Sequence, residues 1–178
     1  MNDREVMAVQ IGRPLRSPGE VVVRCHLDLP VVSRVPPFLE DGTPFPTTYW
    51  LSCPLAMRRI GRIESTGGVA EMEQRAVAAG EFGRRLTAAH ARYAAERDAI
   101  VGTATGPRPT GGVGGARTGV KCLHAHYADS AAGHDNPVGE ETARRIEPLD
   151  CTVPCVVDAG SGVVLNPAWQ EPGGGLPP

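Results

Sequence analysis

Three short β-branched segments occupy the first third of the chain, and they restrict the folds that it can adopt. Residues 20–25 (EVVVRC), 31–35 (VVSRV) and 47–51 (TTYWL) are typical of strands, and turn-forming prolines, aspartates and glycines separate them. The simplest arrangement is a three-stranded antiparallel β-meander. Because three strands need a covering layer to be stable, helices are expected to pack against them.

Helical patterns follow these segments. Pro54 can occupy the first position of a helix that ends at Gly67-Gly68, and a second helix is expected over residues 69–79. The strongest amphipathic pattern covers residues 82–101, and two more helices are expected over residues 120–132 and from Asn136 to about Ile146. The sequence therefore predicts an α+β fold in which four or five helices cover a small antiparallel sheet.

The distribution of glycine and proline suggests the domain boundaries. The chain has 22 glycines and 17 prolines among 178 residues, which is about twice the usual share. We expect a leader over residues 1–19 and a single α+β domain over residues 20–147, with a flexible loop at 102–118. The Pro- and Gly-rich residues 148–178 are expected to form a disordered tail.

Several classes of protein are disfavoured. The N-terminus has no cationic segment followed by an apolar stretch, and no apolar run is long enough to cross a membrane. A net charge of −2 makes a nucleic-acid partner unlikely. The five cysteines are an odd number in a chain without an export signal, which favours reduced thiols in the cytoplasm over a disulfide framework.

One group of cysteine and histidine residues could bind a metal. If residues 120–132 are helical, Cys122 and His126 lie on one face at spacing i, i+4, and both can reach one ion. Cys25 ends the first predicted strand and Cys53 follows the third. These four residues predict a closed, structural Cys₃His zinc site. The alternative is that the cysteines pack as small apolar side chains in the core.

Other patterns keep different functions open. Cys151 and Cys155 could form a second ligand pair, although Pro154 argues against a helix there. The glycine-rich residues 111–119 precede a predicted helix, so Arg117 and Lys121 could bind an anion. A small hydrolase or phosphate-ligand enzyme would use this loop together with Cys122, His124 or His126, since a thiol at a helix start beside a cation has thiolate character. We expect His124 and Asp135 to lie in a second shell around such a site.

Six segments, spread in order over residues 10–147, resemble the actinobacterial domain of unknown function 501. They are Leu29-Pro30 to Val35-Pro36-Pro37, Asp41-Gly42-Thr43-Pro44-Phe45-Pro46-Thr47, Tyr49-Trp50-Leu51-Ser52-Cys53-Pro54, Ala89-His90-Ala91-Arg92-Tyr93-Ala94-Ala95-Glu96-Arg97-Asp98, Val120-Lys121-Cys122-Leu123-His124-Ala125-His126 and Asp135-Asn136-Pro137-Val138-Gly139. The resemblance implies no activity. It implies a gene neighbourhood with a cell-division coiled-coil protein and an exopolyphosphatase, which are therefore the partners to consider. Some relatives carry histidine where this chain has Cys53, an exchange that suits a metal ligand.

The sequence thus supports two functions. The first is a non-enzymatic accessory or regulatory domain stabilised by a zinc ion on Cys25, Cys53, Cys122 and His126. The second is the hydrolase or phosphate-ligand enzyme described above. Four ligands that converge with no open position would favour the first, and an open cleft beside the glycine-rich loop would favour the second.

Overall fold

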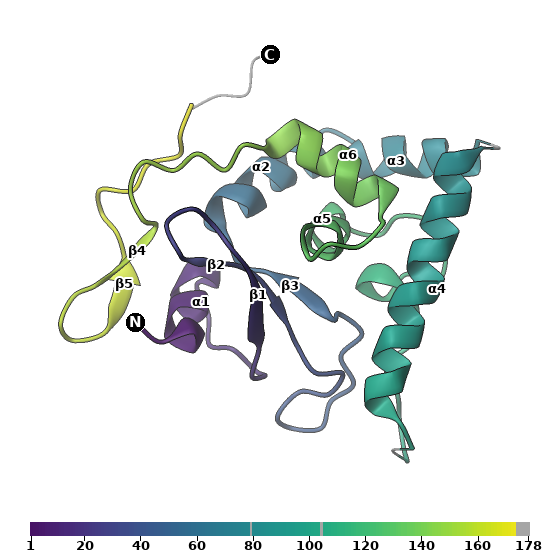
Figure 1. Cartoon of the computed structure of the whole chain (residues 1–178), viewed down its shortest axis with the longest axis horizontal. Helices are drawn as coiled ribbons and strands as arrows, with labels where there is room; N and C mark the ends of the chain where they lie inside the picture. Colours follow the sequence, from purple (N-terminus) through teal and green to yellow (C-terminus); the bar gives the residue numbers. More distant parts are fainter. Residues whose placement is uncertain (79, 104, 174–178) are drawn as a thin grey trace.

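The three predicted strands form the sheet at the centre of the molecule (Figure 1). The computed structural model describes residues 1–78, 80–103 and 105–173. Strands β1 (Glu20–Arg24), β2 (Pro30–Arg34) and β3 (Tyr49–Leu51) pair antiparallel in the order β1-β2-β3. The β-meander and the α+β fold class are thereby confirmed.

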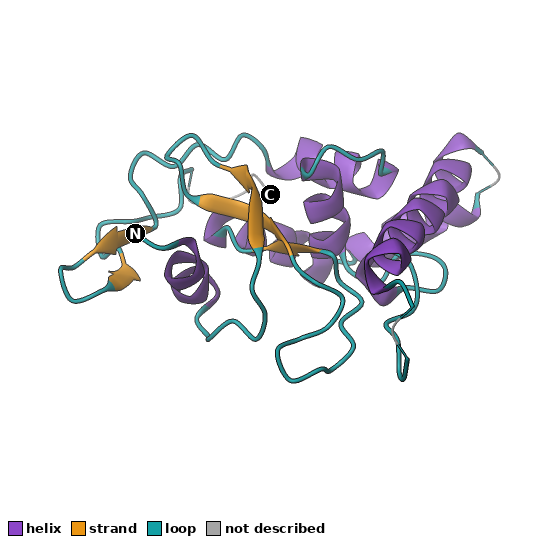
Figure 2. Cartoon of the chain, turned by 60° about the horizontal axis from the view of Figure 1, so that its bottom comes forward, coloured by secondary structure: helices purple, strands orange, loops and turns teal. Residues whose placement is uncertain are grey.

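Strand β2 is covered on both of its faces. Its first four residues are all buried, although neighbouring side chains of a strand point in opposite directions. Helix α1 (Asp3–Ile11) contacts β2, and α5 (Leu123–Ala131) contacts β3 (Figure 2). The fifth residue of β2, Arg34, is exposed and forms an ion pair with Glu20 across the β1–β2 ladder.

The five predicted helices are present. They are α2 (Pro54–Ser65), α3 (Gly68–Val77), α4 (Glu81–Val101), α5 and α6 (Pro137–Ile146). Helix α6 begins as its sequence indicates, because the Asn136 side chain accepts a hydrogen bond from the amide of Gly139 and Pro137 occupies the first turn. None of the helices within the described residues combines the length and the apolar character that a membrane span requires.

Helix α1 lies in the segment that we expected to be a leader, and with it the described residues contain six α-helices. The Asn2 side chain caps its first turn, and the helix ends at Gly12, whose φ of 69° suits glycine. Three of its own residues are buried: Val6, Met7 and Gln10. This helix is short and weakly patterned, so its stability comes from the surface that it covers.

The segment after residue 147 also differs from the expectation of a disordered tail. Within residues 148–173, strands β4 (Val156–Asp158) and β5 (Val163–Leu165) form a hairpin that contacts α1. Arg59 of α2 holds this segment through bonds of 2.6 and 2.7 Å to the carbonyl oxygens of Ile146 and Pro148. Residues 174–178 of the predicted tail lie outside the described residues.

Candidate functional site

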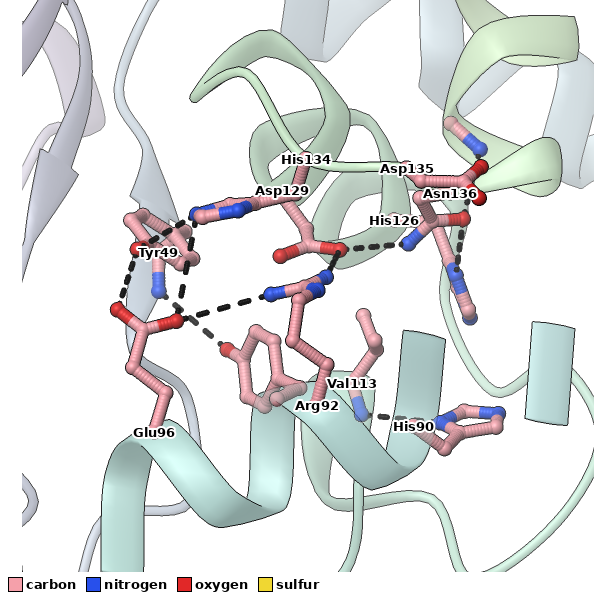
Figure 3. Close-up of polar contacts among 12 residues, drawn as sticks. Tyr49, His90, Arg92, Glu96, Val113, His126, Asp129, His134, Asp135 and Asn136 are labelled. Carbon is pink, nitrogen blue, oxygen red and sulfur yellow. Dashed lines mark hydrogen bonds and ion pairs between the residues drawn. The ribbon is translucent and has the colours of Figure 1, made fainter. Parts of the chain in front are cut away.

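A buried polar network joins α4 to the α5–α6 pair (Figure 3). Asp129 of α5 is fully buried, and its Oδ2 accepts hydrogen bonds from Arg92 Nη2 at 2.6 Å and from Asn136 Nδ2 at 2.9 Å. Burial raises the pKa of Asp129, and the hydrogen bonds from Asn136 and Arg92 oppose that rise. The charged form of the Asp129 carboxylate therefore depends on these two hydrogen-bond donors.

The network extends to β3 through Tyr49. The Tyr49 hydroxyl donates to Glu96 Oε1 at 2.6 Å, and His134 Nε2 lies 2.8 Å from the same hydroxyl (Figure 3). Burial and the neighbouring Glu96 carboxylate raise the pKa of Tyr49. Tyr93 of α4 is fully buried, and its hydroxyl oxygen accepts the amide N–H of Thr48 at 2.6 Å. These contacts tie the sheet to α4 and give the network a structural role.

His126, one of the predicted zinc ligands, belongs to this network. Its Nδ1 lies 3.0 Å from Asn136 Oδ1, which also accepts the amide N–H of Gly139, so Nδ1 is the protonated nitrogen. The ring packs edge-on against His90 at 5.6 Å. Complete burial lowers the pKa of His126 to about 4, which keeps the imidazole neutral.

Cys122 is placed differently from the expectation because it precedes α5. It is the N-cap residue with extended φ and ψ of −158° and 121°, so the i, i+4 relation to His126 does not apply. Its Sγ lies instead 3.8 Å from Nδ1 of His124. Glu64 Oε1, from the last turn of α2, lies 3.3 Å from the same nitrogen and accepts the amide N–H of Leu123 at 2.6 Å.

Cys25 and Cys53 line a different place, a cavity of about 20 Å³ between the sheet, α1 and the C-terminal segment. Cys151 and Cys155 line the same cavity, so four of the five cysteines surround it. Cys25 follows β1, Cys53 is the N-cap residue of α2, and the other two precede β4. Segments far apart in the sequence therefore supply one thiol-rich cavity.

Two N–H groups point at sulfur atoms of this cavity. Gln10 Nε2 of α1 lies 3.6 Å from Cys155 Sγ, and Trp169 Nε1 lies 3.4 Å from Cys151 Sγ. Burial raises the pKa of Cys53 to about 11 and also raises that of Cys155. Without a cation these two thiols are protonated at neutral pH.

The glycine-rich loop is held by α4. His90 Nδ1 accepts the amide N–H of Val113 at 3.0 Å, and His90 Nε2 donates to the Gly119 carbonyl at 2.9 Å. The amide N–H groups of Gly112, Gly115 and Ala116 donate to carbonyl oxygens of the same loop. Since these amides have partners inside the protein, they are not free to bind a phosphate group.

The predicted anion-binding residues and the predicted second-shell residues have different surroundings in the structure. Arg117 is exposed and lines an open pocket beside α4, whereas Lys121 is exposed just before α5. Asp135 is an exposed partner of Arg85, whose Nε lies 3.0 Å from its Oδ1. His124 does lie beside a predicted ligand, Cys122. It faces the sulfur directly, so it belongs to the ligand group and not to a surrounding shell.

The four predicted zinc ligands are not brought together in the described part of the chain. Cys25 and Cys53 line the cavity, Cys122 pairs with His124, and His126 lies in the polar network. Among the residues described, one group of three or more His, Cys, Asp or Glu side chains has all its ligand atoms within 4.8 Å: Glu64, Cys122 and His124. No local sequence pattern marks Glu64 as a ligand, because its approach to Cys122 and His124 depends on how α2 packs against α5.

Comparison with known proteins identifies a family but no activity. A family model described as "Protein of unknown function (DUF501)" matches residues 21–144. No curated protein and no solved structure matches the chain. The matched segment contains Cys25, Cys53 and all of the Glu64, Cys122 and His124 group, and it ends before Cys151.

Proposed function

The chain belongs to the DUF501 family, and we propose that it is a cytoplasmic, non-enzymatic accessory domain stabilised by one structural zinc ion. The proposed ligands are Cys25, Cys53, Cys151 and Cys155. This set keeps two of the residues that the sequence indicated. It replaces Cys122 and His126 with the pair of cysteines in the C-terminal segment.

The observation that carries the proposal is the convergence of four thiols on one small cavity. A space of about 20 Å³ is enough for one small occupant, since a single water molecule needs about 10–15 Å³. The four sulfur atoms come from three separate regions of the chain. They are farther apart than in a closed tetrahedral site, so zinc would draw the side chains inward toward a common centre.

The surroundings of the sulfur atoms suit a bound cation. Four thiolates are a ligand set that selects zinc, and a structural zinc site has no open position. The N–H groups of Gln10 and Trp169 would donate to the charged sulfur atoms, as groups around a metal site commonly do. Because burial raises the pKa of Cys53 to about 11, a metal would have to displace its proton, so binding would weaken as pH falls.

Zinc at this place would hold the two ends of the chain to the sheet. The cavity touches α1 through Gln10, the β1–β2 turn through Cys25, the start of α2 through Cys53 and the C-terminal segment through Cys155. Such a cross-link stabilises the fold by restricting the unfolded chain. Closed coordination leaves no position for a substrate, which supports a non-enzymatic role.

Elemental analysis of full-length protein, purified without a metal-affinity tag, tests the proposal. We expect tightly bound zinc in the wild type and its loss in Cys151→Ser, a change at a half-buried position. The melting temperature of the variant should fall by about 10 °C or more, because a structural zinc ion contributes several kcal/mol. Cys122→Ser is the matched control, since Cys122 lies outside the cavity and its loss should leave this zinc in place.

Two results would contradict the proposal. If Cys151→Ser retains as much tightly bound zinc as the wild type, the cavity is not the site. If metal-free wild type melts at the same temperature as protein supplied with zinc, the cysteines act as apolar core residues.

A further inference from the structure

A second convergence of metal-binding side chains lies at the start of α5, away from the cysteine cavity. Glu64 reaches it from the end of α2, Cys122 is the N-cap residue of α5, and His124 belongs to its first turn. We infer that these three residues form an exchangeable site for a zinc-class divalent cation, with the fourth coordination position open to water or an added anion. This inference does not depend on the cysteine cavity.

The distances match those of ligands around a tetrahedral zinc ion. At the tetrahedral angle, Zn–S of about 2.3 Å and Zn–N and Zn–O of about 2.0 Å place the sulfur and nitrogen about 3.5 Å apart, and the nitrogen and carboxylate oxygen about 3.3 Å apart. The observed separations are 3.8 Å from Cys122 Sγ to His124 Nδ1 and 3.3 Å from His124 Nδ1 to Glu64 Oε1. All three ligand atoms lie within 4.8 Å of one another, so small side-chain shifts would bring them around one ion.

The partners of the ligands hold them in the required orientation. His124 Nε2 lies 3.2 Å from the carbonyl oxygen of Met57, and because a carbonyl can only accept, Nε2 carries the proton. The other ring nitrogen, Nδ1, faces Cys122 Sγ and Glu64 Oε1. A metal-binding histidine usually donates its other N–H in this way. The Glu64 carboxylate is fixed as well, since its Oε1 accepts the amide N–H of Leu123.

The site is accessible, which separates it from a structural site. The side chains of His124 and Glu64 are 29% and 26% exposed, so both ligands lie partly at the protein surface. Three protein ligands with mixed sulfur, nitrogen and oxygen donors and a solvent-facing fourth position are typical of zinc sites that bind an exogenous ligand. A water molecule or a small anion could complete the coordination shell there.

Cobalt(II) titration of metal-free, full-length protein tests the inference, because the thiolate-to-cobalt charge-transfer band reports a bound sulfur. We expect Cys122→Ser to bind one equivalent of cobalt fewer than the wild type. Glu64→Gln should weaken binding at this site by at least about tenfold, and its amide oxygen can still accept the Leu123 N–H, so the fold is kept. Glu73→Gln, which removes a charge from an exposed position of α3, is the matched control and should bind cobalt like the wild type.

Sodium azide tests the open position. Azide should change the visible cobalt spectrum of the wild type and of Cys151→Ser, and it should have no effect on the cobalt spectrum of Cys122→Ser. The inference is overturned if Cys122→Ser and the wild type bind equal amounts of cobalt. It is also overturned if azide leaves the wild-type spectrum unchanged, which would indicate closed coordination. Because Cys151 belongs to the other site, failure here leaves the proposed structural zinc untouched.

Discussion

Replacing Arg92 with leucine should expose how much the fold depends on the buried carboxylate of Asp129. In the native protein, Asp129 Oδ2 accepts one charged hydrogen bond from Arg92 at 2.6 Å and one neutral hydrogen bond from Asn136 at 2.9 Å. The substitution Arg92→Leu leaves a fully buried carboxylate with only the neutral donor. The variant must then either keep an uncompensated charge in the interior or take up a proton.

The size of the effect follows from this geometry. Breaking a fully buried ion pair from one side costs about 3–5 kcal/mol. The Arg92 side chain is 32% exposed, so solvent screens part of the interaction and we expect a loss of about 2–3 kcal/mol. For a chain of this length the melting temperature should fall by roughly 5–10 °C.

The loss should also depend on pH. Burial raises the pKa of Asp129 in the folded protein, so the folded state holds this proton more tightly than the unfolded state does. The contribution of Asp129 to stability therefore falls as pH rises from the unfolded pKa of about 3.9 through the raised folded pKa. Without Arg92 the folded pKa rises further, and the cost of Arg92→Leu should be small near pH 4 and complete near pH 7.

Chemical denaturation of wild type and variant at both pH values measures this cost. The double variant Arg92→Leu/Asp129→Asn, which has no buried charge, should be more stable at pH 7 than Arg92→Leu alone. Arg144→Leu removes a guanidinium that is 66% exposed and should cost less than about 0.5 kcal/mol. An equal loss at both pH values, together with no rescue by Asp129→Asn, would refute the reasoning and assign the effect of Arg92→Leu to lost packing.

Three further predictions rest on other contacts. Tyr93→Phe should lower the free energy of unfolding by about 1–3 kcal/mol in denaturation experiments, because it leaves the buried N–H of Thr48 without its partner. Tyr127→Phe is the comparison: the Tyr127 hydroxyl donates to an exposed glutamate, so its loss should cost less than about 1 kcal/mol. Gly139→Ala should reduce the yield of folded protein, because its Cβ would lie 2.2 Å from a backbone carbonyl oxygen of α5; unchanged circular dichroism and melting temperature would contradict this. The hydrogen bond from Arg62 lowers the pKa of Glu171, so the contribution of Glu171 to stability is present above about pH 4.3 and is lost at lower pH. Amide exchange of residues 156–171 should show this loss, and Glu171→Gln should remove the pH dependence.

The elements that the sequence predicted are those with local signals. The strands were identified because β-branched runs end at turn residues, and α2 and α6 because Pro54 and Pro137 mark their first turns. Helix α1 has no comparable pattern. Its buried side is defined by β2 and the C-terminal hairpin, which are distant in sequence, so its stability is a property of the assembled fold.

The same distinction explains the outcome for the C-terminal segment. Its glycines and prolines indicate little regular structure, and within the described residues 148–173 two strands of three residues each form. What orders it is contact with distant residues: Arg59 binds its carbonyl oxygens, and Trp169 lines the cysteine cavity. Composition reports the absence of local structure, and it carries no information about such long-range contacts.

The candidate metal ligands were predictable by type but not by grouping. Cysteine and histidine stand out in the sequence as candidate ligands, yet grouping Cys122 with His126 required Cys122 to be inside the helix. Cys122 has the extended conformation of an N-cap residue instead of a helical conformation. Its sulfur therefore lies near His124 and Glu64. Helix boundaries are uncertain by one or two residues from sequence, and here that margin decides which residues share a site.

The two proposed sites differ in how they relate to the family. Glu64, Cys122 and His124 all lie within residues 21–144, the segment that the family model matches, whereas the cysteine cavity needs Cys151 and Cys155 from beyond it. The cavity therefore depends on a C-terminal segment that the family model does not cover, and the α5 site does not. If the cavity zinc only stabilises the fold, Cys151→Ser protein below its melting temperature should retain the cobalt and azide responses of the α5 site. Loss of those responses in a folded Cys151→Ser variant would mean that the two sites are coupled through α2, which carries Cys53 at its start and Glu64 at its end.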